Sequence, residues 1–157
     1  MLRSRGGGSP EVQRAFLFSC NTGLRISDVR ALRWKQVKNG RLHFVQQKTG
    51  GREYLPLSAT AKDLLGEHGE PSEKVFDLPA DSAVNRHVRL IAEEAEIDKY
   101  PTYHYSRHTY AVLLLSNDVP IYAVSKLMDH DDVATTEIYA NVLDNDKRDA
   151  VEGLPTL

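Results

Sequence analysis

Cysteine is nearly absent from this 157-residue sequence, which has Cys20 and no other. A single cysteine excludes an internal disulfide and fits a reducing compartment such as the cytosol, so we expect Cys20 to be a small buried residue. No run of about 18 apolar residues is present, and no membrane span is expected. A secretory signal requires an apolar segment, and the first ten residues contain none. A cytoplasmic, single-domain globular protein is therefore predicted.

The sequence also has no net positive charge, since its formal charge at pH 7 is −2. The distribution is uneven, however. Residues 1–60 carry 11 basic and 3 acidic side chains, whereas residues 61–157 carry 9 and 19. This asymmetry predicts a basic face contributed by the first third of the chain, of the kind that binds nucleic acid. An ordinary solvated surface is the alternative, and it applies especially to Lys35 and Lys38.

Local patterns predict an α+β fold that is mainly helical. Residues 1–9 are rich in glycine and are expected to be a linker or cloning remnant. A helix should begin at Pro10, with Ser9 as its cap, and end at Gly23. Residues 41–48 and 53–57 alternate as strands do and should form a β-hairpin with Lys48 at its tip. Further helices are predicted at about 26–33, 60–68, 82–97, 105–116, from 121, and from 131 through Tyr139.

One cluster of residues indicates chemistry on a phosphate. His104-Tyr105-Ser106-Arg107-His108 is followed by His130 and Tyr139, and Arg25 and Lys48 precede it. Arginine is planar, always charged and bidentate toward phosphate oxygens, so an enzyme without a metal can use it to neutralise a phosphodiester. A tyrosine with a pKa of about 10 needs a base and a positive neighbourhood before it can attack phosphorus.

The ordered set resembles the catalytic residues of the tyrosine recombinases, the phage integrase family, over about residues 11 to 145. The resemblance implies a recombinase catalytic domain, with a small β-hairpin or three-stranded sheet, that cleaves and rejoins DNA without metal, cofactor or ATP. The stretches 16–34 and 104–110 are similar to integrases of Bacteroidetes-type mobile elements. The implied catalytic residues are Arg25, Lys48, His104, Arg107, His130 and Tyr139.

The resemblance gives each residue a role. Arg25 and Arg107 would flank the scissile phosphate and stabilise the transition state, with Asp28 orienting Arg25. His104 would be the base or a proton relay, and Lys48 would protonate the 5′-oxygen leaving group.

Two further residues complete the implied set. His130 would hydrogen-bond the phosphate, and Tyr139 would form a 3′-phosphotyrosyl link. The sequence departs from the family at Met128-Asp129-His130, where Leu-Gly-His is usual. The acid either makes the His130 imidazole more basic or adds repulsion near the phosphate.

The implied partner is double-stranded DNA at an attachment or crossover site. A tetrameric synapse is expected on DNA and a monomer in its absence, in a bacterial cytoplasm near the nucleoid. We expect residues 10–157 to be the catalytic domain and the N-terminal core-binding domain to be absent.

Three alternatives remain open at this stage. A type IB topoisomerase-like enzyme uses the same chemistry, and a catalytically silent DNA-binding remnant would keep the residues without the reaction. His104 and His108 have the spacing of a zinc pair, but we interpret His108 as structural support. The other histidines, His43, His68 and His87, are expected at the surface.

Overall fold

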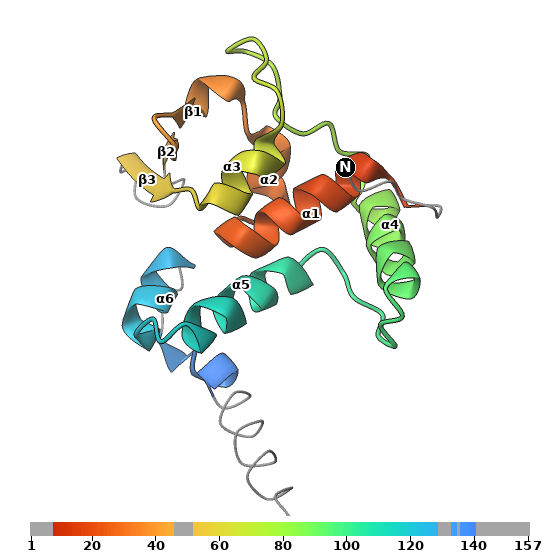
Figure 1. Cartoon of the computed structure of the whole chain (residues 1–157), viewed down its shortest axis with the longest axis vertical. Coiled ribbons are helices and arrows are strands. Elements are labelled where there is room, and N and C mark those ends of the chain that lie inside the picture. Colours follow the sequence, from red (N-terminus) through yellow and green to blue (C-terminus); the bar gives the residue numbers. More distant parts are fainter. Residues whose placement is uncertain (1–7, 46–51, 129–132, 135, 141–157) are drawn as a thin grey trace, which may run out of the picture. The chain divides into compact units, whose positions relative to one another are not determined.

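A computed structural model describes residues 8–45, 52–128, 133–134 and 136–140 of the chain (Figure 1). The chain divides into two compact units, Met1–Arg107 and His108–Leu157. Each unit is described separately below. Within the described ranges, no helix combines the length and the apolar character needed to cross a bilayer.

Helix α1 (Pro10–Thr22) begins and ends where the sequence predicts. The Ser9 hydroxyl accepts a hydrogen bond from the Val12 amide, and Pro10 occupies the first turn, where its missing N–H costs nothing. Gly23 ends the helix with a left-handed φ of 69°, and its amide donates to Ser19 O at 2.8 Å. Because glycine reaches this conformation without a Cβ clash, it is a natural helix stop.

A three-stranded antiparallel sheet follows α2 (Ile26–Ala31) and the short 3₁₀ helix η1 (Trp34–Gln36). The predicted hairpin is confirmed as β2 (Arg41–Val45) and β3 (Arg52–Pro56), which pair from Arg41↔Pro56 to Val45↔Arg52. The edge strand β1 (Val37–Lys38) pairs with β2, and a turn of Asn39 and Gly40 connects the two strands. The φ values of these turn residues are 52° and 70°. Two left-handed residues are what a tight hairpin turn needs.

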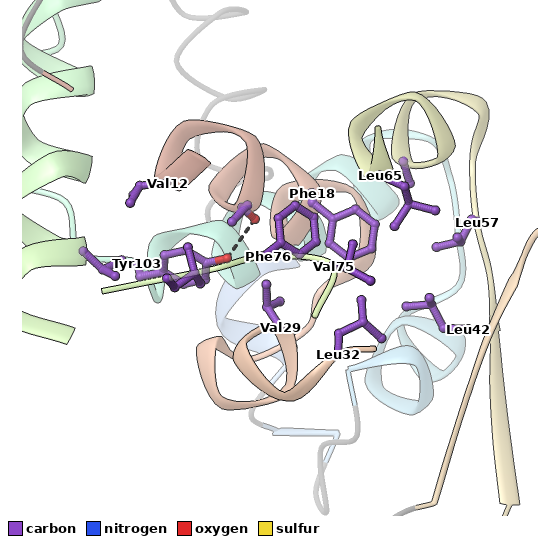
Figure 2. Close-up of a cluster of buried hydrophobic side chains, with 14 of the residues drawn as sticks. Val12, Phe18, Val29, Leu32, Leu42, Leu57, Leu65, Val75, Phe76 and Tyr103 are labelled. Carbon is purple, nitrogen blue, oxygen red and sulfur yellow. Dashed lines mark hydrogen bonds between the residues drawn. The ribbon is translucent and has the colours of Figure 1, made fainter. Parts of the chain in front are cut away.

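The first unit is held together by one large apolar core (Figure 2). Helix α1 packs against α2, α3 (Ala59–Leu65) and α4 (Asp81–Glu94). Phe18 and Phe76 are fully buried, with ring centroids 5.1 Å apart. Buried residues from the sheet and its flanks, such as Leu42 and Leu57, extend the same core. Cys20 is also buried, in agreement with the prediction.

The second unit has a much smaller described core. Helix α5 (Tyr105–Ser116) starts at the end of the first unit and continues into the second, and α6 (Ile121–Leu127) follows Pro120. Residues 136–140 are helical. The buried apolar residues are Tyr110, Ala111, Val124 and Met128. Not all of the apolar run of α5 is buried, since Ala111 is inaccessible to solvent whereas Leu113 is 46% exposed.

Candidate active site

Arg25 lies in the short connection between two helices of the first unit. It is the N-cap residue of α2, with extended backbone angles, and it is exposed. The left-handed turn at Gly23 ends α1 only two residues earlier. An arginine here can reach outward from a connection that α1 and α2 hold on both sides, as a phosphate-binding residue must.

Arg107 is anchored to the same connection. Its side chain is only 6% exposed, and Nη1 donates a hydrogen bond to the carbonyl oxygen of Gly23. A buried guanidinium needs hydrogen-bond acceptors for its N–H groups. A backbone carbonyl accepts from one of these groups without neutralising the positive charge. The positive charge of Arg107 is therefore held beside the backbone that presents Arg25.

His104 lies in the turn just before α5 and is electrostatically coupled to both arginines. Partial burial, and then the positive charges of Arg107 and Arg25, lower the pKa of its imidazole from the ordinary value of 6.5. A neutral imidazole is therefore favoured at pH 7, since two cations oppose a third. The first unit thus brings together three of the six predicted residues, including both arginines.

Tyr103 fixes the turn that carries His104 and Arg107. Its hydroxyl donates to Ala15 O at 2.7 Å and is 2.8 Å from Ser19 Oγ, which ties the turn to α1. Figure 2 shows Tyr103 with a hydrogen bond at its hydroxyl. Its backbone amide donates to Asn85 Oδ1 on α4 at 2.8 Å. Burial raises the pKa of this phenol. Tyr103 is therefore an anchor for this turn, a role that no local sequence pattern indicates.

Tyr139 lies in the second unit and is half-buried. Its ring packs against the small core of Tyr110, Ala111, Val124 and Met128. Its hydroxyl lies 2.6 Å from Nδ1 of His108, and the two rings are tilted by 49°. His108 is therefore in direct contact with the candidate nucleophile, a contact that the sequence did not reveal.

The two remaining predicted residues lie outside the described part of the chain. Lys48 belongs to the connection between β2 and β3, and His130 follows α6. The departure at Asp129 lies there too. Their predicted roles, and the orientation of Arg25 by Asp28, stay predictions.

Several basic side chains from the first third of the chain stabilise the fold itself. Arg14 pairs with Glu11, donates to Leu65 O and covers the Phe76 ring at 4.5 Å. Arg30 pairs with Asp81 at 2.6 Å. Arg14 and Arg30 therefore serve contacts within the fold, and the basic face expected from composition stays a prediction. Lys35, Lys38 and Arg41 are exposed.

The histidine expectations have a mixed outcome. Within the described residues, no three His, Cys, Asp or Glu side chains gather as a metal site would require. His43 is exposed, as expected, and so is His68, although its ring stacks on Trp34. His87 is half-buried instead, because its Nδ1 accepts a hydrogen bond from the Ser9 amide at 3.1 Å.

Comparison with known proteins adds a family-level match. Residues 9–146 match the family model described as the phage integrase family. The tyrosine recombinase XerD of Rhizobium meliloti is 30% identical over 83% of this chain and 47% of its own length. XerA of Saccharolobus solfataricus is 29% identical over 82% of this chain and 45% of its own. The chain thus spans about half the length of these curated relatives.

Solved structures agree with the fold. The catalytic domain of bacteriophage HP1 integrase covers 98% of this chain and 86% of its own, with a TM-score of 0.65 and 23% identity. A lambda integrase dimer bound to a core site covers 87% of this chain and 53% of its own, with a TM-score of 0.62 and 20% identity. The predicted fold class, a mainly helical domain with a small three-stranded sheet, is confirmed.

Proposed function

Because the chain belongs to the phage integrase family, we propose that it is the catalytic domain of a tyrosine site-specific recombinase, which cleaves and rejoins DNA strands. The observation that carries this proposal is the gathering of Arg25, His104 and Arg107 in the first unit. Two guanidinium groups around one imidazole match what a phosphodiester requires when no metal neutralises it.

The cations act on the charge that builds up on the phosphate in the transition state. Arg107, held against the Gly23 carbonyl, provides a fixed positive charge, and Arg25 provides a second one from the exposed connection. Fixed charges stabilise a transition state without reorganising as the reaction proceeds. His104, kept neutral by the two cations, relays a proton at the phosphate, and His130 hydrogen-bonds the same group.

The covalent step exchanges one phosphodiester for another. The oxygen of Tyr139 attacks phosphorus, the bond to the 5′-oxygen breaks, and Lys48 gives that oxygen a proton. The phosphotyrosyl link conserves the energy of the broken bond, so a 5′-hydroxyl from another strand can reverse the step without ATP. No metal is needed, since side chains supply the positive charge.

Double-stranded DNA carrying an attachment or crossover site is the proposed substrate. Lambda integrase has been solved as a dimer bound to a core site, which supports DNA as the partner here and self-association on it. We extend this to a tetrameric synapse formed from free monomers, in a bacterial cell. A mobile element of Bacteroidetes-type bacteria is the proposed source.

Covalent trapping tests the reaction. The chain, and separately Tyr139→Phe, would be mixed with a pool of nicked duplexes whose sequence around the nick is randomised. Loss of the short strand beyond the nick prevents religation, so a covalent complex accumulates and is seen on a denaturing gel. We expect a band from the parent chain and none from Tyr139→Phe, and sequencing of the captured DNA would reveal the preferred site.

The other outcomes separate the alternatives. A band that persists in Tyr139→Phe would contradict the assignment of the nucleophile. DNA retained without any covalent band, by both proteins, would favour a silent DNA-binding domain. His43→Gln is a suitable control, because this exposed histidine on β2 lies outside the proposed catalytic set.

A further inference from the structure

His108 makes a close contact with the atom that the proposed reaction uses. Its Nδ1 lies 2.6 Å from the Tyr139 hydroxyl, a short distance for a hydrogen bond between a ring nitrogen and a phenol. The ring centroids are 5.4 Å apart and tilted by 49°, so the imidazole edge meets the hydroxyl and the rings are not stacked face to face. Both residues belong to the second unit.

The surroundings hold the pair in this geometry. The ring of Tyr139 packs on the buried cluster of Tyr110, Ala111, Val124 and Met128, which restricts its rotation about the side-chain bonds. His108 projects from α5, which also supplies Tyr110 and Ala111 to that cluster. One helix therefore carries part of the apolar support of the tyrosine and the imidazole that meets its hydroxyl.

We propose that His108 is the proton acceptor for Tyr139, a role that rests on the proposed strand-cleavage function. A phenol is a weak nucleophile until its proton is removed, and a base within hydrogen-bond reach is the first requirement for activating it. His108 meets that requirement among the described residues. His104 fits the role less well, because a lowered pKa makes an imidazole a weaker base.

The step balances with groups already assigned. The proton of Tyr139 moves to Nδ1 of His108 as its oxygen bonds to phosphorus and the bond to the 5′-oxygen breaks. The leaving oxygen takes its proton from Lys48. In the reverse reaction the imidazolium returns its proton to the departing phenol, so His108 ends unchanged.

A probe that needs no DNA tests this assignment directly. An aryl sulfonyl fluoride reacts with a tyrosine by forming an oxygen–sulfur bond and releasing fluoride, and a neighbouring base accelerates it by taking the phenol proton. Labelling of each tyrosine would be followed over time by peptide mass spectrometry. Tyr100 and Tyr122, which are 80% and 63% exposed, are internal references without a comparable imidazole contact among those described.

Two variants separate proton transfer from simple positioning. His108→Gln retains an oxygen that can accept the phenol hydrogen bond but cannot act as a base. His108→Ala removes the ring and leaves space that added imidazole can fill. His43→Gln is the matched control, and circular dichroism would show that each variant folds.

The assignment makes a definite prediction. Tyr139, although half-buried, should label faster than the two exposed references, and His108→Gln should slow it on the order of 100-fold. Imidazole should restore the rate in His108→Ala and leave His108→Gln unchanged. Equal labelling of Tyr139 and the references, or no effect of His108→Gln, would overturn the proposal. Because DNA is absent, a failure in covalent trapping would bear on the proposed function alone.

Discussion

The two units of this chain differ in how much core supports their functional residues. In the first unit, Arg107 is bonded to a helix end that belongs to a core of many buried side chains. In the second unit, Tyr139 packs on a described core of four buried residues. Arg107 thus lies in the unit with the larger described core, and Tyr139, the proposed nucleophile, lies in the unit with the smaller described core.

This difference fits the demands of the two roles. Electrostatic stabilisation of a transition state depends on charges that do not move. A covalent nucleophile must instead approach phosphorus, hold the DNA end and depart again. Regions with few buried apolar contacts open at lower free energy than large cores, so the small core described around Tyr139 fits the role proposed for it.

The largest expected difference between the two units comes from truncating a buried side chain in the core of each. Phe18 is fully buried beside Phe76, so Phe18→Ala should lower the free energy of unfolding by about 3–5 kcal/mol. Met128→Ala, in the smaller core, should raise amide exchange in α6 while leaving α1 protected. Hydrogen exchange measured by mass spectrometry would check both variants. Uniformly faster exchange in both would show that the units unfold together.

Alanine variants of the two arginines should have similar effects on strand cleavage but different effects on the free energy of unfolding. Arg25→Ala and Arg107→Ala should each slow covalent trapping on the order of 10²- to 10³-fold, because each removes a charge from the transition state. Arg107→Ala should reduce stability more than the exposed Arg25→Ala does, by about 1–3 kcal/mol, since it leaves the Gly23 carbonyl without this donor. Urea unfolding would measure this, with Lys35→Ala as a surface control.

Tyr103→Phe should have an intermediate effect within the first unit. It keeps the ring and removes the hydroxyl that bonds to Ala15 O and Ser19 Oγ, which should cost about 1–3 kcal/mol. Thermal unfolding would measure the loss. Tyr100→Phe is the matched control, because this phenol is 80% exposed. If both variants unfold alike, the anchoring role of Tyr103 is wrong.

The smallest expected effect is a change in the titration of His104. Arg25→Ala should raise the pKa of its imidazole toward 6.5, because one of the cations that oppose protonation is gone. In the parent chain, His104 binds more protons when unfolded than when folded between its lowered pKa and 6.5. Its contribution to stability therefore falls as pH decreases through that window. Proton NMR of the imidazole would follow the titration, and an unchanged pKa in Arg25→Ala would contradict the coupling.

Features that depend on neighbouring residues could be predicted from the sequence. The cap at Ser9 and the stop at Gly23 follow from local hydrogen bonding and backbone freedom. The strand Val37–Lys38 has only two residues, too few for an alternating pattern to show. Its turn, Asn39-Gly40, carried the signal that could have found it.

Candidate site residues could be proposed from the sequence, but the contacts that support them could not. The candidate residues stand out because a spaced set of cations, histidines and a tyrosine suits phosphate chemistry. Tyr103 reaches Ser19 and Ala15 across 84 and 88 positions, and His108 meets Tyr139 across 31. Contacts at such separations are created by folding, and no local pattern encodes them. The exposure of Leu113 likewise depends on packing between distant segments, which no local pattern encodes.

The left-handed turn at Gly23 has a consequence for the spacing of the two guanidinium groups. Arg25 follows that turn by two residues, and Arg107 is bonded to its carbonyl oxygen. The positions of both positive charges therefore depend on the backbone at Gly23. If α1 shifts slightly, both side chains are expected to follow the Gly23 backbone. The separation between these two proposed phosphate-binding charges should then change little.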